Sequence, residues 1–118
     1  VTNDTGAVLA LGRTRRLATH KQRLALAARD GGCSFPGCTR PAAWCEAHHV
    51  IPWRLGGRTD LANLCLVCRF HHREFERRGW RVAVRDGHPE WIAPPWLDPD
   101  QQPRRNTAHH PPDSDFVR

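Results

Sequence analysis

Two clusters of cysteine and histidine contain the residues of this sequence best suited to chemistry. The first consists of Cys33 and Cys38, followed about thirty residues later by Cys68 and His71. Two short knuckles at such a spacing are typical of structural zinc sites, in which four side chains surround one ion tetrahedrally. We therefore predict a structural zinc ion held by Cys33, Cys38, Cys68 and His71.

The fourth ligand of this first cluster is ambiguous, because Cys65 forms a Cys-x2-Cys pair with Cys68 and could replace His71. Neighbouring residues on a helix lie about 100° apart, so His71 and His72 cannot both face one tetrahedral ion. Assigning His71 to zinc frees His72 for another role, which favours the set with His71. We interpret Cys65 and Cys45 as core residues, since free cysteine is among the most buried residue types.

Several short elements must position these residues. We predict a helix over residues 14–29, with Thr14 as N-cap and a stop at Asp30-Gly31-Gly32, and then an irregular loop over residues 33–43. The buried face of this helix is expected to consist of four apolar residues: Leu17, Leu24, Ala25 and Ala28.

Downstream of the loop, the sequence predicts two hairpins and a second helix. Strands are expected over residues 44–51 and 61–65, joined through the Gly56-Gly57 turn, with a helix over residues 68–78 after them. Residues 80–92 alternate apolar and polar side chains on either side of Asp86-Gly87, which indicates a β-hairpin. The second cluster, His48-His49, Asn63 and His72, then falls on a strand, a strand and a helix.

The size and composition of the chain indicate one small domain. It has 118 residues, of which 39% are hydrophobic and 25% charged. We assign residues 1–12 to a linker, 13–97 to the domain, and 98–118 to a proline-rich disordered tail. The sequence begins at Val1 and contains no methionine, so we expect it to be a segment of a longer protein with a further N-terminal region.

Cysteine content and hydropathy bear on location. Five cysteines, an odd number, beside eight histidines fit metal ligation in a reducing compartment, so we expect a cytoplasmic protein. The longest apolar run, residues 7–11, is far shorter than the roughly 20 residues of a membrane-spanning helix, and no basic segment precedes it. No membrane partner is therefore expected.

Positive charge is concentrated in the middle of the chain. Residues 13–81 contain 14 arginines and lysines against 5 acidic residues, whereas the remainder contains 4 against 7. This excess predicts a polyanionic partner, and arginine suits phosphate oxygens because its guanidinium donates in a planar fork. We expect phosphate contacts from four arginines near the second cluster: Arg54, Arg58, Arg69 and Arg73. The tryptophans are interpreted mainly as packing residues.

The segment CEAHHVIPWRLGGRTDLANLCLVCRFHH resembles the core of the HNH (His-Asn-His) nucleases. The flanking GRTRRLATHKQRLALAARDGGCSFPGC and PPWLDPDQQPRRN resemble more narrowly the C-terminal HNH domain of large actinobacterial proteins, so that the likeness covers most of residues 12–106. The resemblance implies an α+β fold with a small ββα-metal core, to which this sequence adds the N-terminal helix, the zinc knuckle and the C-terminal β-hairpin.

The same resemblance implies roles for the second cluster. His49 corresponds to the general base that takes a proton from the attacking water, and a neutral imidazole suits that transfer near neutral pH. His48 and His72 correspond to ligands of a divalent ion, with Mg²⁺ expected and Mn²⁺, Ni²⁺, Co²⁺ or Zn²⁺ also suited to imidazole. Asn63 corresponds to the asparagine that bridges backbone across the hairpin. Hydrolysis of DNA to 5′-phosphate and 3′-hydroxyl ends is implied, and RNA is not excluded.

Some assignments remain open at this level. Related domains often carry a third histidine where this chain has Glu76, which either reaches the ion or pairs with Arg73 or Arg77. Glu46 is either an outer group of the metal site or an ordinary arginine partner. The alternative functions are a zinc-stabilised nucleic-acid-binding module without catalysis, a zinc enzyme acting on another substrate, and a purely structural interaction domain.

Overall fold

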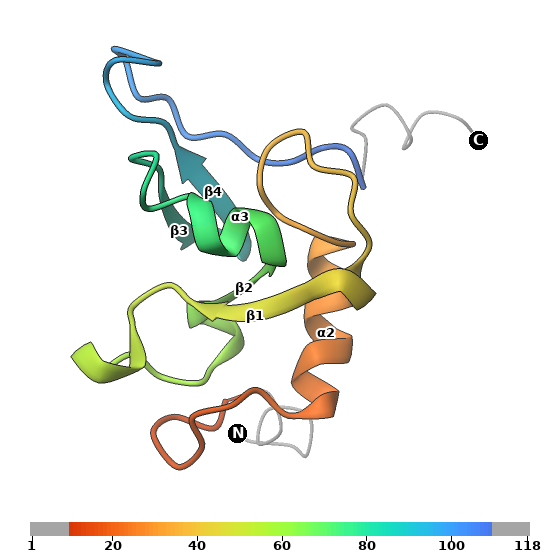
Figure 1. The fold of residues 1–118 in the computed structure, drawn as a ribbon. Helices are drawn as coiled ribbons and strands as arrows, with labels where there is room; N and C mark the ends of the chain where they lie inside the picture. Colours follow the sequence, from red (N-terminus) through yellow and green to blue (C-terminus); the bar gives the residue numbers. More distant parts are fainter. Residues whose placement is uncertain (1–9, 110–118) are drawn as a thin grey trace.

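The structure of the chain is a computed structural model, which describes residues 10–109 (Figure 1). The fold is α+β, as predicted, and residues 10–109 contain two α-helices and two separate antiparallel hairpins. The helices are α2 (His20–Asp30) and α3 (Arg69–Glu74), and the strands are β1 (Cys45–His49), β2 (Leu64–Cys68), β3 (Arg81–Arg85) and β4 (His88–Ile92). Short 3₁₀ turns cover Ala42–Trp44, Trp53–Leu55 and Leu61–Asn63.

Helix α2 begins later than the sequence predicts. Its N-cap is Thr19, whose side chain accepts from the Gln22 backbone N–H while the Gln22 side chain accepts from the Thr19 N–H. This capping box satisfies two N–H groups at the start of the helix and fixes that start at His20, so the predicted start at Thr14 is wrong. The predicted stop is confirmed, because Gly31 has a left-handed φ of 78° and closes the helix.

The buried face of α2 also differs from the predicted one. Leu17 and Leu24 are 76% and 56% exposed, whereas Leu26 and Gln22 are fully buried. Gln22, Leu26 and Asp30 are spaced four residues apart, so they share the face that packs on β2. Polar residues at two of these three positions hid this face from a search for apolar periodicity.

The hairpin of β1 and β2 is the centre of the fold. Its register runs from Cys45 opposite Cys68 to His49 opposite Leu64, and every residue of β2 is buried. The return strand lies three residues later than the predicted 61–65 because the 3₁₀ turn at Leu61–Asn63 precedes it. As a result, Cys68 ends β2 and is also the N-cap of α3.

Helix α3 is shorter than the predicted 68–78. Its last residue is Glu74, and hydrogen-bonded turns over residues 75–79 follow it. Gly79, with a φ of 85°, ends these turns, and the Trp80 N–H donates to the Phe75 carbonyl. The second hairpin is confirmed: β3 and β4 pair around Asp86-Gly87, where both residues have a positive φ, as type I′ turns require.

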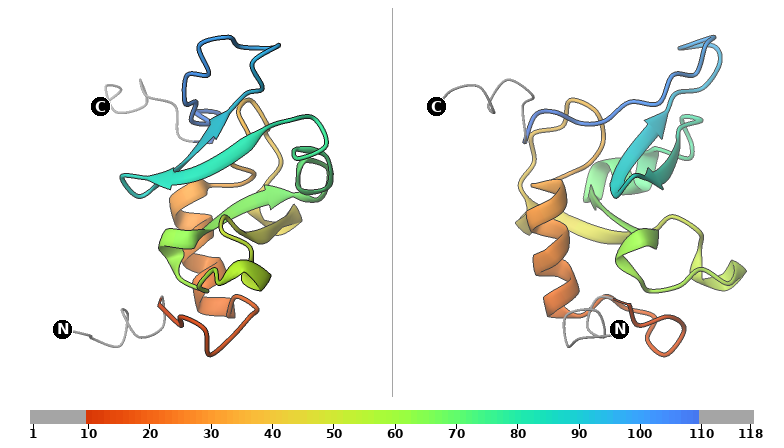
Figure 2. Two further views of the ribbon diagram at one scale, coloured as in Figure 1. Left: turned by 90° about the vertical axis from the view of Figure 1, so that its left-hand side faces the viewer. Right: turned by 180° about the vertical axis from the view of Figure 1, so that it is seen from behind.

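The core lies between α2, β2 and β4, which Figure 2 shows from two further sides. Trp91 is fully buried, and its indole N–H donates to the Ser34 hydroxyl, which in turn donates to the Leu66 carbonyl. The Asp30 carboxylate accepts from the Leu66 N–H and pairs with Arg29 at 2.7 Å. These bonds satisfy the edge of β2 that β1 leaves unpaired, so the two-stranded sheet is anchored to its neighbours.

Segments on both sides of the predicted domain pack against it. Residues 98–109 cross the loop that precedes β1 (Figure 1), and Arg104 pairs with Trp91 in a β-bridge. Asn106 donates to the carbonyls of Cys33 and Cys38, both at 2.8 Å. The expected disorder is thus wrong for residues 98–109, while the rest of the predicted tail, 110–118, lies outside the described residues.

At the other end of the described chain, Ala10 bridges to Asp60, so residues 10–12 are attached rather than forming a free linker. Residues 1–9, the remainder of the predicted linker, lie outside the described part. The domain boundaries at residues 13 and 97 stay a prediction. None of the helices in residues 10–109 has the length and hydrophobicity that crossing a membrane requires.

Candidate functional site

The structure brings Cys33, Cys38, Cys68 and His71 together, and we call these four residues the cysteine cluster. Their ligand atoms all lie within 4.8 Å of one another. The His71 Nδ1 atom is 3.6 Å from Cys33 Sγ and 3.3 Å from Cys68 Sγ. A tetrahedral zinc ion with ordinary bond lengths separates sulfur and nitrogen ligands by about 3.6 Å, so the cluster fits zinc in both donor type and spacing.

Local structure explains why this cluster forms. Cys33 and Cys38 lie on the loop after α2, which is folded back by a hydrogen bond from the Cys33 N–H to the Arg40 carbonyl. The His71 ring stacks on Phe35 with their centroids 4.1 Å apart. Burial raises the pKa of Cys38 to about 11, since a thiolate is poorly solvated there. A bound cation reverses that preference, which is what a metal site needs.

The other two cysteines do not belong to the cluster. Cys65 is fully buried in β2 and Cys45 is 3% exposed, so both are core residues, as interpreted from the sequence. Burial raises the pKa of Cys65 to about 12. The alternative in which Cys65 replaces His71 is therefore not supported, because His71 is the residue that the fold places among the ligands.

A second group consists of His48 and His72, which meet between β1 and α3, and of His49, the neighbour of His48 on β1; we call these three residues the histidine cluster. His48 Nδ1 is 3.1 Å from His72 Nε2. Two ligands in neighbouring positions of an octahedral ion with bonds near 2.1 Å lie about 3 Å apart, so this spacing fits a hydrated divalent ion. Burial, followed by repulsion from His72 and His49, lowers the pKa of His48 to about 4, which keeps its imidazole neutral and able to ligate.

Glu46 settles the orientation of the His72 ring. The Glu46 Oε1 atom lies 2.6 Å from His72 Nδ1. Glu46 is on the same face of β1 as His48, because side chains two residues apart in a strand share a face. The carboxylate accepts a hydrogen bond from the His72 Nδ1–H, which leaves the lone pair of Nε2 directed at His48. Glu46 is thus a partner of a histidine, and among the described residues no arginine pairs with it.

His49 points to the opposite face of β1 and meets Thr59. Its Nε2 atom is 3.0 Å from the Thr59 hydroxyl, which donates its single proton to the carbonyls of Arg15 and Arg16. The hydroxyl must therefore accept from His49 Nε2–H, and the lone pair of the imidazole is left on Nδ1. Thr59 is fully buried.

Thr59 was not identified from the sequence as a site residue. The only signal was its place inside the Thr-Asp-Leu-x-Asn-Leu motif.

Positive charges from the segment before α2 surround His49. Burial, followed by the charges of Arg16 and Arg13, lowers its pKa, so that its neutral form is favoured. Arg13 stacks over the Trp53 ring at 3.8 Å and donates to the carbonyls of Trp53 and Gly57. These two arginines were not predicted as site residues, because they lie more than thirty residues from His49 along the chain.

Asn63 bridges the loop between β1 and β2. Its side-chain oxygen accepts from the Ile51 N–H at 2.9 Å, and its amide donates to the carbonyls of Ile51 and Arg58 at 3.1 and 2.9 Å. Gly57 packs so closely on the Ile51 carbonyl that a Cβ atom would overlap it. Together these contacts close the loop that follows His49 directly.

The four arginines expected to bind phosphate are not equivalent. Arg58 pairs with Asp60 at 2.6 Å, and Arg73 lies 3.7 Å from Glu74. Arg54 and Arg69 are exposed, and neither has an ion-pair partner within the described part of the chain. The latter two arginines therefore carry the charge that is available to a polyanion.

Glu76 does not form the expected ion pair with Arg73 or Arg77 in the described part of the chain, and its role at the ion stays a prediction. Arg73, Arg77 and Arg78 all pair with Glu74 instead. Helix α3 ends before Glu76, and over residues 10–109 Glu76 does not join His48 and His72 in a group of three close ligand atoms. It lines a cavity of about 480 Å³ beside His48.

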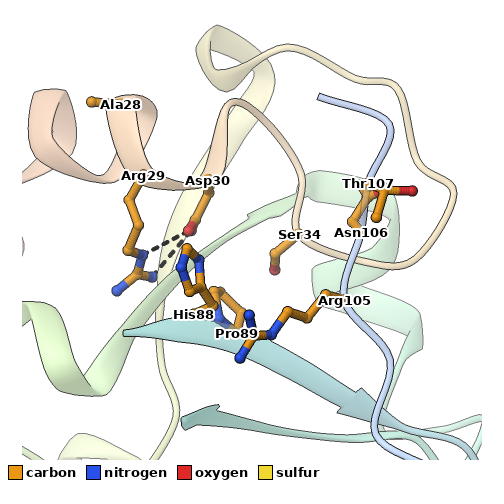
Figure 3. Close-up of a pocket in the computed structure, with 9 residues that line it drawn as sticks. All are labelled: Ala28, Arg29, Asp30, Ser34, His88, Pro89, Arg105, Asn106 and Thr107. Carbon is orange, nitrogen blue, oxygen red and sulfur yellow. Dashed lines mark hydrogen bonds and ion pairs between the residues drawn. The ribbon is translucent and has the colours of Figure 1, made fainter. Parts of the chain in front are cut away.

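A cavity of about 540 Å³, whose wall contains no residue of either cluster, lies between the end of α2, β4 and residues 105–107 (Figure 3). Its two arginines are already paired: Arg29 with Asp30 at 2.7 Å, as drawn in Figure 3, and Arg105 with Glu90 at 2.9 Å. This cavity therefore offers little free positive charge, and the chemistry of the chain is concentrated at the two clusters.

Comparison with known proteins agrees with this arrangement. Residues 33–75 match the family model described as HNH endonuclease. The chain is 49% identical to the uncharacterized protein Rv1128c of Mycobacterium tuberculosis and 47% identical to the uncharacterized protein Mb1179c of Mycobacterium bovis. Each match covers 92% of this chain and 24% of the relative. The chain thus spans about a quarter of these relatives, and no solved structure gives a significant match.

Proposed function

We propose that this chain, whose residues 33–75 carry an HNH endonuclease domain, is a metal-dependent endonuclease that hydrolyses phosphodiester bonds in DNA. The observation that carries the proposal is the pairing of His48 and His72 with nitrogens 3.1 Å apart, next to His49 with one nitrogen free. A divalent ion held by His48 and His72 supplies positive charge to the phosphoryl and leaving oxygens. Mg²⁺ is expected, with Mn²⁺, Ni²⁺, Co²⁺ or Zn²⁺ as substitutes.

In this mechanism, His49 is the general base. Its Nδ1 atom takes a proton from the water that attacks phosphorus, and the bond to the 3′ oxygen breaks on the opposite side, which leaves 5′-phosphate and 3′-hydroxyl ends. Thr59 accepts the Nε2–H hydrogen bond throughout and so keeps the basic nitrogen directed away from the loop. Asn63 holds the loop that carries Thr59 against the end of β1.

Two further parts of the chain support this activity. The cysteine cluster would hold a structural zinc ion, which would join the loop after α2 to the start of α3 and thereby help to place His72. Arg54 and Arg69 bind substrate phosphates, with Arg58 and Arg73 contributing when their exposed and therefore weak ion pairs open. The cytoplasmic location stays a prediction from cysteine content.

The test is cleavage of a supercoiled plasmid by purified protein in buffer free of divalent ions, with each of the five metals added back separately. The zinc content is measured first, so that the structural ion is known to be present. We expect nicking or linearisation by the unchanged chain, loss in His49→Ala, and retention in His88→Ala, which removes an exposed histidine of the other hairpin. The proposal would be overturned if the protein binds the plasmid but does not cut it with any of the five metals.

That opposite result would favour the second candidate function, a zinc-stabilised nucleic-acid-binding module without catalysis. The presence of Glu76 where related domains carry a third histidine is the observation that favours it, because the histidine cluster then has only two ligands.

A further inference from the structure

A cavity of about 530 Å³ opens beside the cysteine cluster, at the start of β1. Its wall includes the side chains of Trp44, Arg40, Arg69 and Glu46. None of these residues is explained by the zinc ion or by the proton transfer at His49. The cavity therefore combines Trp44 and Arg40, which have no role so far, with the phosphate-binding candidate Arg69 and with Glu46, the partner of His72.

Trp44 is unusually open for an indole. Its side chain is 65% exposed, and in the described chain no other ring stacks on it. The 3₁₀ turn that ends at Trp44 holds its backbone, with the Trp44 N–H donating to the Pro41 carbonyl at 2.9 Å. An exposed ring on a fixed backbone is available for stacking at little further entropic cost.

The two arginines supply charge at the same cavity. The Arg69 guanidinium is exposed, and among residues 10–109 it has no ion-pair partner. Arg40 donates to Cys68 Sγ at 3.3 Å and lies over the Phe70 ring at 5.6 Å, so its guanidinium is anchored without being neutralised by a carboxylate. A ligand with a flat ring and a negative charge matches this combination.

Glu46 places the cavity next to the proposed nuclease site. It lines the cavity and also bonds to His72 at 2.6 Å. Its carboxylate is held at the His72 side of the cavity by that bond, and the two guanidinium groups of Arg40 and Arg69 outnumber its single negative charge. A nucleotide bound here would be a close neighbour of the phosphate at the histidine cluster.

We propose that this cavity is a subsite for one unpaired nucleotide of the substrate, with its base stacked on Trp44 and its phosphate held by Arg40 and Arg69. The inference rests on the proposed nucleic-acid function. A base within a duplex is covered on both faces by its neighbours, so only an unpaired base can offer a face to the indole. The chain therefore favours single-stranded or locally unpaired nucleic acid over continuous duplex.

The test measures binding of a fluorescein-labelled DNA strand, alone and annealed to its complement, by fluorescence anisotropy. All variants carry His49→Ala, so that the DNA stays intact, and their zinc content and circular dichroism are compared first. Trp44→Ala is expected to weaken single-strand binding by about 5- to 150-fold, the range found for stacking residues, and to change duplex binding by less than about twofold. Trp44→Phe should restore most of the single-strand affinity.

Trp96→Ala is the matched control, because Trp96 is 77% exposed and lies outside the cavity. Equal single-strand affinities of the Trp44→Ala and Trp96→Ala variants would overturn the subsite. So would equal losses of affinity for single strand and duplex in Trp44→Ala. Failure of the nuclease proposal is seen separately, as absence of plasmid cleavage by the chain with His49 intact.

Discussion

Removal of the Thr59 hydroxyl tests whether this residue sets the protonation of the proposed base. Thr59→Val keeps the shape of the side chain but deletes the acceptor 3.0 Å from His49 Nε2. When His49 takes a proton in the reaction it becomes a cation, and its Nε2–H then donates a charge-assisted hydrogen bond. Such a bond contributes about 1.5–3 kcal/mol, so we expect kcat/KM to fall by about 10- to 150-fold.

The same substitution has a structural cost that must be separated from the catalytic one. The Thr59 hydroxyl also donates to the Arg15 and Arg16 carbonyls, and leaving a buried acceptor unbonded costs about 1–3 kcal/mol of unfolding free energy. Thr59→Ser keeps the hydroxyl and should retain most of the rate. Thr14→Val is the matched control, because its hydroxyl donates to the Leu11 carbonyl in the same segment, away from His49.

The assay is initial-rate cleavage of an oligonucleotide across a range of pH, with stability measured by urea unfolding. Loss of the acceptor also removes stabilisation of the imidazolium, so the acidic limb of kcat/KM in Thr59→Val should move to lower pH. A purely structural residue would not shift this limb. If Thr59→Val and Thr14→Val cleave at the same rate while both retain zinc, the assignment of Thr59 to His49 is refuted.

Three further predictions concern zinc, the hairpin loop and pH. Cys68→Ser should lose the zinc and the cooperative thermal transition, because binding of structural zinc contributes about 10–16 kcal/mol whereas the total stability of a small domain is about 5–15 kcal/mol. Atomic absorption should show that Cys65→Ala, the control, retains zinc. Asn63→Ala leaves three loop hydrogen bonds unmade, so we expect a loss of about 1–3 kcal/mol in urea unfolding and about tenfold or more in kcat/KM, and an unchanged rate would contradict its bridging role. Folding lowers the pKa of His48 to about 4, so below about pH 6.5 the unfolded chain takes up a proton that the folded chain does not. Without added divalent ions, the unfolding free energy should therefore drop by about 1 kcal/mol between about pH 7.5 and about pH 5.5. His48→Gln should reduce this pH dependence.

The contrast between Arg69 and Arg58 shows how the fold sorts residues of the same type. Both belong to the basic middle of the chain, and composition alone treats them alike. Arg58 lies within reach of Asp60 because a tight loop brings them together, whereas Arg69 starts α3 and forms no ion pair among residues 10–109. Charge available to a substrate is therefore a property of the local fold as well as of the sequence.

Local signals in the sequence were sufficient for the elements whose geometry depends on near neighbours. Asp86-Gly87 predicted the second hairpin, because only such residues readily adopt two positive φ angles in succession. Gly31 marked the end of α2 for a related reason. The cysteine cluster was also readable, since ligand type and knuckle spacing restrict which side chains can meet one ion.

Contacts between distant segments were beyond such signals. The Thr59 hydroxyl meets a backbone carbonyl 44 residues away, and Asn106 meets Cys33 73 residues away. Nothing in the spacing of these residues encodes their approach, because it depends on how α2, the hairpin loop and the segment after β4 pack on one another. The sequence thus identified the residue types of the cysteine cluster and of the proposed divalent-ion site, while the tertiary structure determined which polar groups contact the proposed base and which charges stay free of ion pairs among residues 10–109. The physical reason is that local propensity acts over a few residues, whereas side-chain orientation at a site is set by packing across the whole fold.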